Sequence, residues 1–87
     1  MEVRRVAGGQ VVLQAALAGL PAVVREHDWA PLEFSVAVEP AGLVGEPSLA
    51  AGSGVEEVDA FFAMYLVRQF RLAERLPPGF YRVVVGR

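Results

Sequence analysis

Residues 53–76, SGVEEVDAFFAMYLVRQFRLAERL, constrain the fold most, because their apolar spacing predicts one long amphipathic helix. Ser53 and Glu56 have the spacing of a capping box, in which each side chain satisfies a free backbone N–H of the first turn. Pro77 and Pro78 mark the end, since a residue before proline is disfavoured in helical dihedrals. At about 1.5 Å per residue the helix would be about 33 Å long, close to the diameter of a small domain. We therefore expect the apolar face of the helix to pack against a sheet.

Around the helical wheel, the apolar side chains of this segment gather on one broad face. That face contains Val55, Val58, Phe61, Phe62, Tyr65, Leu66, Leu72, Ala73 and Leu76, with Phe70 at its edge. The other side carries Glu56, Glu57, Arg68, Arg71, Glu74 and Arg75. Met64 and Val67 point into this charged side, so we expect them to contact either water or a partner.

Composition limits the remaining possibilities. The 87 residues are enough for a single domain spanning residues 1–87, and a hydrophobic content of 54% excludes disorder. There is no cysteine, so disulfides and thiolate chemistry are excluded. The net charge of −2 gives no electrostatic footprint for nucleic acid. All 8 basic residues are arginine and Lys, Ile, Asn and Thr are missing, which we interpret as the bias of a GC-rich genome; a thermophilic source is compatible with it.

No segment has the length of a membrane span. The longest uninterrupted apolar run, residues 15–24, is well short of the roughly 20 residues required. The apolar stretch over residues 11–15 is also too short for a signal peptide. We therefore expect a cytoplasmic protein with no membrane partner.

Strand signals are clearest over residues 32–39, where Phe34, Val36 and Val38 alternate with polar or small residues. This alternation predicts a strand with one buried face. A weaker edge strand is expected where Gly45 and Pro47 interrupt an apolar stretch, because proline is confined to sheet edges. This weak strand covers residues 43–49, and the other predicted strands cover residues 3–7 and 80–85.

Residues 10–20 are open to two interpretations. The Ala-rich stretch favours a helix over residues 11–27, kinked at residues 19–21. Gly8 and Gly9 lie between two apolar runs, which is also a hairpin signal.

The first interpretation gives the order β-α-β-β-α-β. It predicts an α+β fold of two layers, with a small, mainly antiparallel sheet, helices on one face and a ferredoxin-like order. The alternative is an N-terminal β-hairpin, followed by a short helix, a strand, the long helix and a last strand. Neither architecture implies a function by itself.

The two apolar residues on the charged side of the long helix predict an interface. Met64 and Val67 would form its centre, and Arg68 and Arg71 its rim. Met and Arg are enriched in protein interfaces, and the two-fold dimer is the commonest symmetric assembly. We therefore expect a homodimer or another protein partner.

Three arginines suggest a second type of site. Arg68, Arg71 and Arg75 would lie within about 60° of one another on the helix, where they could clamp an acidic ligand. Alternatively, they complement the negative end of the helix dipole, and Glu74 is close enough to pair with Arg71.

Catalytic signals are weak. His27 is the only histidine and has carboxylates at Glu26 and Asp28, but the chain offers it no cysteine or second histidine. A lone histidine here more often complements a helix end, with Trp29 covering the core. We assign no catalytic residue, metal ligand or cofactor.

The leading hypothesis is therefore a small non-enzymatic protein that acts by self-association or as a subunit of a complex. The alternatives are a regulatory domain that binds an acidic metabolite and, third, a low-specificity enzyme that uses His27.

Overall fold

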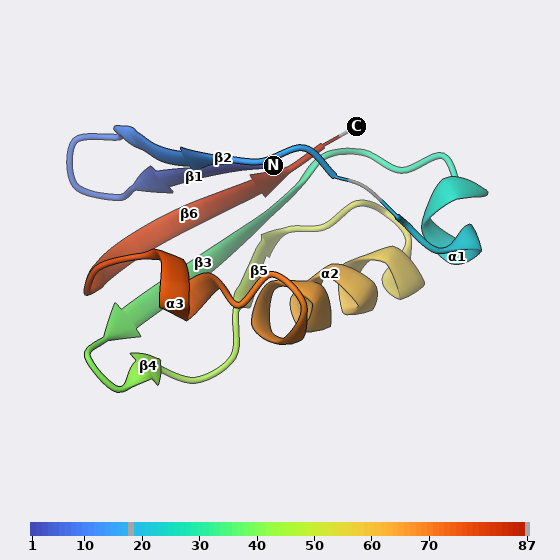
Figure 1. Ribbon diagram of the computed structural model, residues 1–87. Coiled ribbons are helices and arrows are strands. Elements are labelled where there is room, and N and C mark those ends of the chain that lie inside the picture. Colours follow the sequence, from blue (N-terminus) through green and yellow to red (C-terminus); the bar gives the residue numbers. More distant parts are fainter. Residues whose placement is uncertain (18, 87) are drawn as a thin grey trace.

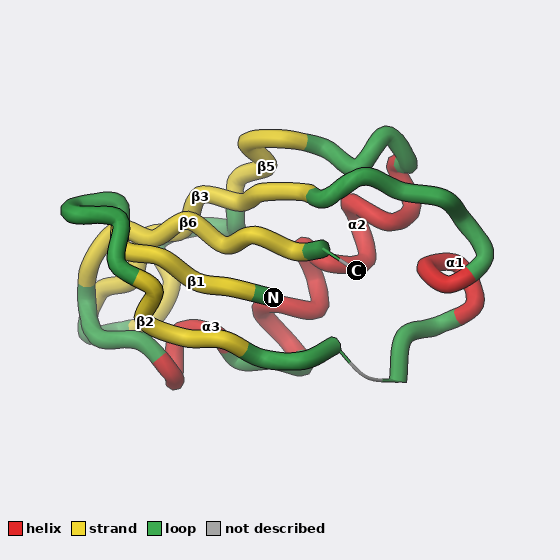
Figure 2. The backbone as a smooth tube through the Cα atoms, turned by 90° about the horizontal axis from the view of Figure 1, so that it is seen from above, coloured by secondary structure: helices red, strands yellow, loops and turns green. Residues whose placement is uncertain are grey.

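The computed structural model describes residues 1–17 and 19–86, which form an α+β structure with an antiparallel sheet of six strands and three helices (Figure 1). The strands are β1 (Glu2–Arg5), β2 (Val11–Gln14), β3 (Leu32–Glu39), β4 (Gly42–Leu43), β5 (Ser48–Ala51) and β6 (Gly79–Val85). The helices are α1 (Ala22–Arg25), α2 (Glu56–Arg68) and α3 (Leu72–Arg75). Helices α2 and α3 lie on one face of the sheet, and α1 lies beyond its end (Figure 2).

The strand order is β2-β1-β6-β3-β4, and β5 also pairs with β3. Each neighbouring pair is antiparallel, and the C-terminal strand β6 lies between β1 and β3. The ferredoxin-like order is not confirmed, because β1 and β2 form a hairpin before the first helix. The alternative prediction of an N-terminal hairpin agrees with this arrangement.

The alternating pattern predicted for residues 32–39 is confirmed in β3. Leu32, Phe34, Val36 and Val38 are buried, while the residues between them lie toward the other face. In β6 the same period buries Tyr81, Val83 and Val85. The weak strand expected over residues 43–49 is split into β4 and β5, and Gly45 and Pro47 lie in the break.

The helix predicted over residues 11–27 is wrong in its first half, where β2 pairs with β1; Ala18 lies outside the described residues. Gly8 and Gly9 have φ angles of 86° and 67°, which allow the tight reversal that an L residue resists. The Arg5 amide donates to the Gln10 carbonyl at 2.9 Å and closes the turn. Pairing with β1 thus outweighs the modest helix propensity of the alanines.

The long helix predicted over residues 53–76 is also corrected. It ends at Arg68, and Arg71 adopts a left-handed conformation with φ 53° before the short helix α3. The break lets Phe70 join the core, since the Phe70 amide donates to the Tyr65 carbonyl at 2.8 Å and the two rings stack at 6.2 Å. An unbroken helix would leave Phe70 at the edge of the apolar face.

The predicted capping box does not form. Val55 is the N-cap residue of α2, and the buried Ser53 exchanges hydrogen bonds with the Val55 backbone. Asp59, not Glu56, reaches back, and its carboxylate accepts the Ser53 amide hydrogen at 2.9 Å. Ser53 is held outside the helix because its carbonyl accepts a hydrogen bond from Ala30.

Candidate interaction surface

The outer side of α2 is apolar at its centre. The side chains of Met64 and Val67 are 53% and 41% exposed, which confirms that they point away from the core. On the opposite side, Val58, Phe62 and Leu66 are fully buried against the sheet. We call Met64, Val67, Arg68 and Arg71 the α2 surface.

Three hollows adjoin this surface. A hollow of about 180 Å³ separates Met64 and Val67 from Pro47, and one of about 280 Å³ lies between Met64 and Phe61. A third, of about 400 Å³, lies between Val67 and Ala73. Met64 and Val67 therefore project beside hollows of side-chain size. Helices pack against one another by placing such projecting side chains into the grooves of the partner.

The charges of α2 are divided between its two ends. Glu56, Glu57 and Asp59 occupy the first turn and Arg68 the last, as the helix dipole favours. Within residues 1–17 and 19–86, neither Glu57 nor Arg68 makes an ion pair. Both groups are available to a partner.

The three arginines predicted to form one stripe no longer share a helix. Arg68 ends α2, Arg71 occupies the left-handed turn and Arg75 belongs to α3. The Arg75 guanidinium lies 4.3 Å from the centre of the Phe70 ring, and its Nε donates to the Phe70 carbonyl at 2.7 Å. Arg71 pairs with Glu74 at 3.7 Å, as expected from their spacing. The ligand-binding prediction for these arginines has lost the helical geometry on which it was based.

The uncovered face of the sheet exposes a second apolar group, which was not predicted from the sequence. Phe80 is 71% exposed and lies opposite Ala37 in the register of β6 and β3. The Val6 amide donates to the Phe80 carbonyl, and the Val44 amide donates to the Ala37 carbonyl, so the four residues form one row across the strands. The alternation of Phe80 with Tyr81 was a usable signal, because Tyr81 is in the core. We call Val6, Ala37, Val44 and Phe80 the sheet row.

Charged residues on the same uncovered face pair with one another. Arg4 donates to Glu2 at 2.8 Å, and Arg82 donates to Glu33 at 3.4 Å. The hydrogen bond from Arg4 is the main cause that lowers the pKa of the Glu2 carboxyl.

The side chains of His27 and Trp29 both contact backbone carbonyls of α1. Nδ1 of His27 lies 2.7 Å from the Val23 carbonyl in α1, and the Trp29 indole N–H donates to the Val24 carbonyl at 2.9 Å. Across residues 1–17 and 19–86, no cluster of three or more His, Cys, Asp or Glu side chains could hold a metal ion. None of the helices in that part of the chain has the length and apolarity needed to cross a membrane.

Comparison with models of protein families, with curated proteins and with solved structures finds no match to this chain.

Proposed function

We propose that this protein acts by association rather than catalysis, and that its partner is a second copy bound through the α2 surface. The observation that carries the proposal is the exposed pair Met64 and Val67 beside three hollows. In a two-fold dimer the same patch meets itself, so it must supply both ridges and the spaces that receive them. The α2 surface has both.

The charges of α2 favour an antiparallel pairing of the two helices. Glu57 lies seven residues before Met64, and Arg68 lies four residues after it. With the two-fold axis near Met64, the acidic first turn of one helix approaches the basic last turn of the other. A parallel pairing would bring like charges together. The antiparallel dimer therefore suits both the apolar centre and the charged ends.

Light scattering coupled to size exclusion tests this proposal. The wild-type chain is expected to elute as a dimer at micromolar concentration, and Met64→Asp as a folded monomer, because the substitution places a carboxylate at the centre of the contact. A wild-type monomer at high micromolar concentration would contradict the proposal.

The two alternative functions, a regulatory domain that binds an acidic metabolite and an enzyme that uses His27, have weaker support. A regulatory role through Arg68, Arg71 and Arg75 needs three converging cations, and the Arg75 guanidinium already packs on Phe70. An enzyme based on His27 needs a second reactive group, and the described contact of its ring nitrogen is with a backbone carbonyl.

A further inference from the structure

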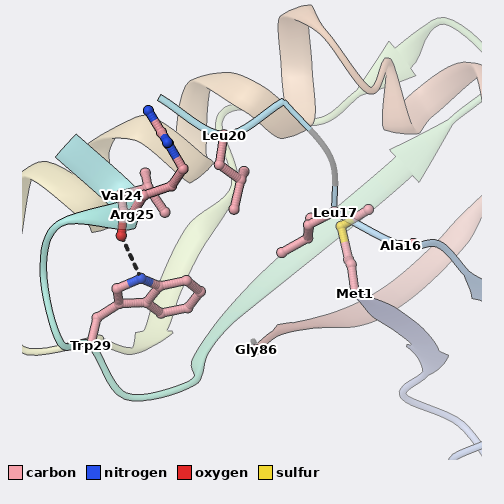
Figure 3. A pocket seen from close by; sticks show the side chains of 8 residues that line it. All are labelled: Met1, Ala16, Leu17, Leu20, Val24, Arg25, Trp29 and Gly86. Carbon is pink, nitrogen blue, oxygen red and sulfur yellow. Dashed lines mark hydrogen bonds between the residues drawn. The ribbon is translucent and has the colours of Figure 1, made fainter. Parts of the chain in front are cut away.

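One end of the molecule contains a pocket separate from the α2 surface. It has a volume of about 570 Å³ and lies between α1, the segment after β2 and the end of β6 (Figure 3). Apart from Arg25 and the amino group of Met1, which donates to the Ala15 carbonyl at 2.8 Å, its described lining is apolar or backbone: Met1, Ala16, Leu17, Leu20, Val24, Trp29 and Gly86. The volume is in the range of small-molecule sites, which extends from roughly 300 to 1,000 Å³.

The Trp29 wall of this pocket is held in place. The Trp29 indole N–H donates to the Val24 carbonyl at 2.9 Å, and the ring also packs against Phe62, with 5.5 Å between ring centres. Its remaining surface lines the pocket (Figure 3). Since α1 has only four residues, the segment around it supplies few side chains to fill this end. Apolar walls without partner atoms lose dispersion contacts, which an apolar ligand restores.

Arg25 carries the charged side chain among the described lining residues, and Figure 3 shows its guanidinium directed outward from the Trp29 ring, so this charge lies at the rim of the pocket. It is exposed, it makes no ion pair within residues 1–17 and 19–86, and none of the described lining residues is acidic. Glu26 follows it in the chain but does not line the pocket. A single guanidinium fork matches one carboxylate, with two parallel N–H···O bonds.

We propose that this pocket binds a small amphipathic carboxylate of the fatty-acid type. Its apolar chain packs against Leu17, Leu20 and Trp29, and its carboxylate pairs with Arg25 at the rim. This activity is independent of the proposed dimer, because none of the residues that line the pocket belongs to the α2 surface.

Trp29 is the only tryptophan in the chain, so its fluorescence reports on this pocket directly. Titration with sodium decanoate is expected to give a saturable change in Trp29 emission and a matching heat in calorimetry, with a Kd of roughly 10–100 μM. Decan-1-ol and decyltrimethylammonium share the apolar chain without the negative charge, and both are expected to bind at least about tenfold more weakly. Absence of both the emission change and the heat with decanoate would overturn the proposal.

Variants separate the two parts of the site. Arg25→Gln is expected to weaken decanoate binding about tenfold, and Arg25→Lys to restore part of it. Arg82→Gln, which removes an arginine on the uncovered sheet face, is the matched control and should bind as the wild type does. Leu17→Glu should abolish binding while far-UV circular dichroism remains unchanged. Equal affinity of the Arg25→Gln and Arg82→Gln variants, or equal binding of decanoate and decan-1-ol, would overturn the role of Arg25.

Discussion

The α2 surface and the sheet row lie on different layers of the molecule, and both expose large apolar side chains. Exposure alone would favour the sheet row as the interaction surface, because the side chain of Phe80 is 71% exposed and that of Met64 is 53% exposed. Their charged neighbours differ. Arg4 and Arg82 pair with carboxylates of the same uncovered sheet face, whereas Glu57 and Arg68 make no ion pair within the described residues. We therefore base the choice of the α2 surface as the proposed contact on its available charge and adjoining hollows, rather than on apolar exposure alone.

The residues of the uncovered sheet face are typical of a solvent-exposed face. Antiparallel sheets commonly pack one face on the core and leave the other solvated. On this face, the next pair along the strands from Ala37 and Phe80 is Ser35 with Arg82, and the pair after it is Glu33 with Val84. Polar and apolar residues alternate closely on this face. We therefore place the proposed dimer contact on α2.

The largest expected effect separates these two surfaces directly. Met64→Asp should weaken the dimer by about 2 kcal/mol or more, roughly 30-fold, because a central residue of an interface carries much of its binding energy. Phe80→Asp, the matched change on the sheet row, should leave the dimer intact. Sedimentation equilibrium measures both constants. Dissociation by Phe80→Asp with an intact Met64→Asp dimer would reverse the assignment.

Charge reversal gives the next largest effect. Glu57→Arg and Arg68→Glu should each weaken the dimer by about 0.5–1 kcal/mol, and the double variant should recover most of the loss, since opposite ends meet in an antiparallel pair. The loss of dimer affinity in each single variant should become smaller at high salt, because salt screens exposed charges. The corresponding swap of Glu33 and Arg82 on the sheet is the control and should not change the dimer constant. Equal affinity for all of these variants would contradict the antiparallel arrangement.

A smaller effect tests the break that ends α2. Arg71→Gly should raise the free energy of unfolding by about 0.5 kcal/mol, because a left-handed arginine is strained and glycine is not, although glycine loses more entropy on folding. Urea unfolding in the Met64→Asp background isolates the monomer. Arg75→Gly removes the contact with Phe70 and should therefore lower the free energy of unfolding. A loss of stability in Arg71→Gly would show that the turn depends on the arginine side chain.

The smallest effect concerns acid stability on the sheet face. The hydrogen bond from Arg4 holds the pKa of Glu2 below its ordinary value, so the pair stabilises the fold above the unfolded pKa. This contribution is lost as the pH falls through the lowered folded pKa. Glu2→Gln should therefore melt slightly below the wild type near neutral pH, and the difference should vanish well below about pH 4. Glu39→Gln is the control, and a Glu2→Gln deficit that persists in acid would contradict this origin.

Local periodicity predicted the centre of the sheet well. The alternation over residues 32–39 depends only on which side chains face the core, so β3 was predictable from sequence. The first half of the helix predicted over residues 11–27 failed because pairing of β2 with β1 is a tertiary interaction between separate segments. Helix propensities differ by less than about 1 kcal/mol per residue and are easily outweighed by such pairing.

The break at Arg71 was not predictable for a different reason. Left-handed conformations are usually marked by glycine or asparagine, and this position carries arginine. Burial of Phe70 and Leu72 on the same core compensates for the strain, and that depends on the finished packing. Exposure of Met64 and Val67 was predictable, because both precede the break and follow the helical period. Exposure of Phe80 was predictable from its alternation with Tyr81, but the sheet row as a whole requires the register of four separate segments.

Cross-linking at Met64 tests the antiparallel dimer most directly. The chain contains no cysteine, so a single Met64→Cys variant has one thiol per copy. A residue near a two-fold axis lies beside its own symmetry mate, and a disulfide needs Cβ atoms about 4 Å apart. Mild oxidation should convert Met64→Cys rapidly to a covalent dimer, whereas Phe80→Cys should stay monomeric on denaturing gels. Rapid cross-linking of Phe80→Cys with none for Met64→Cys would contradict the account.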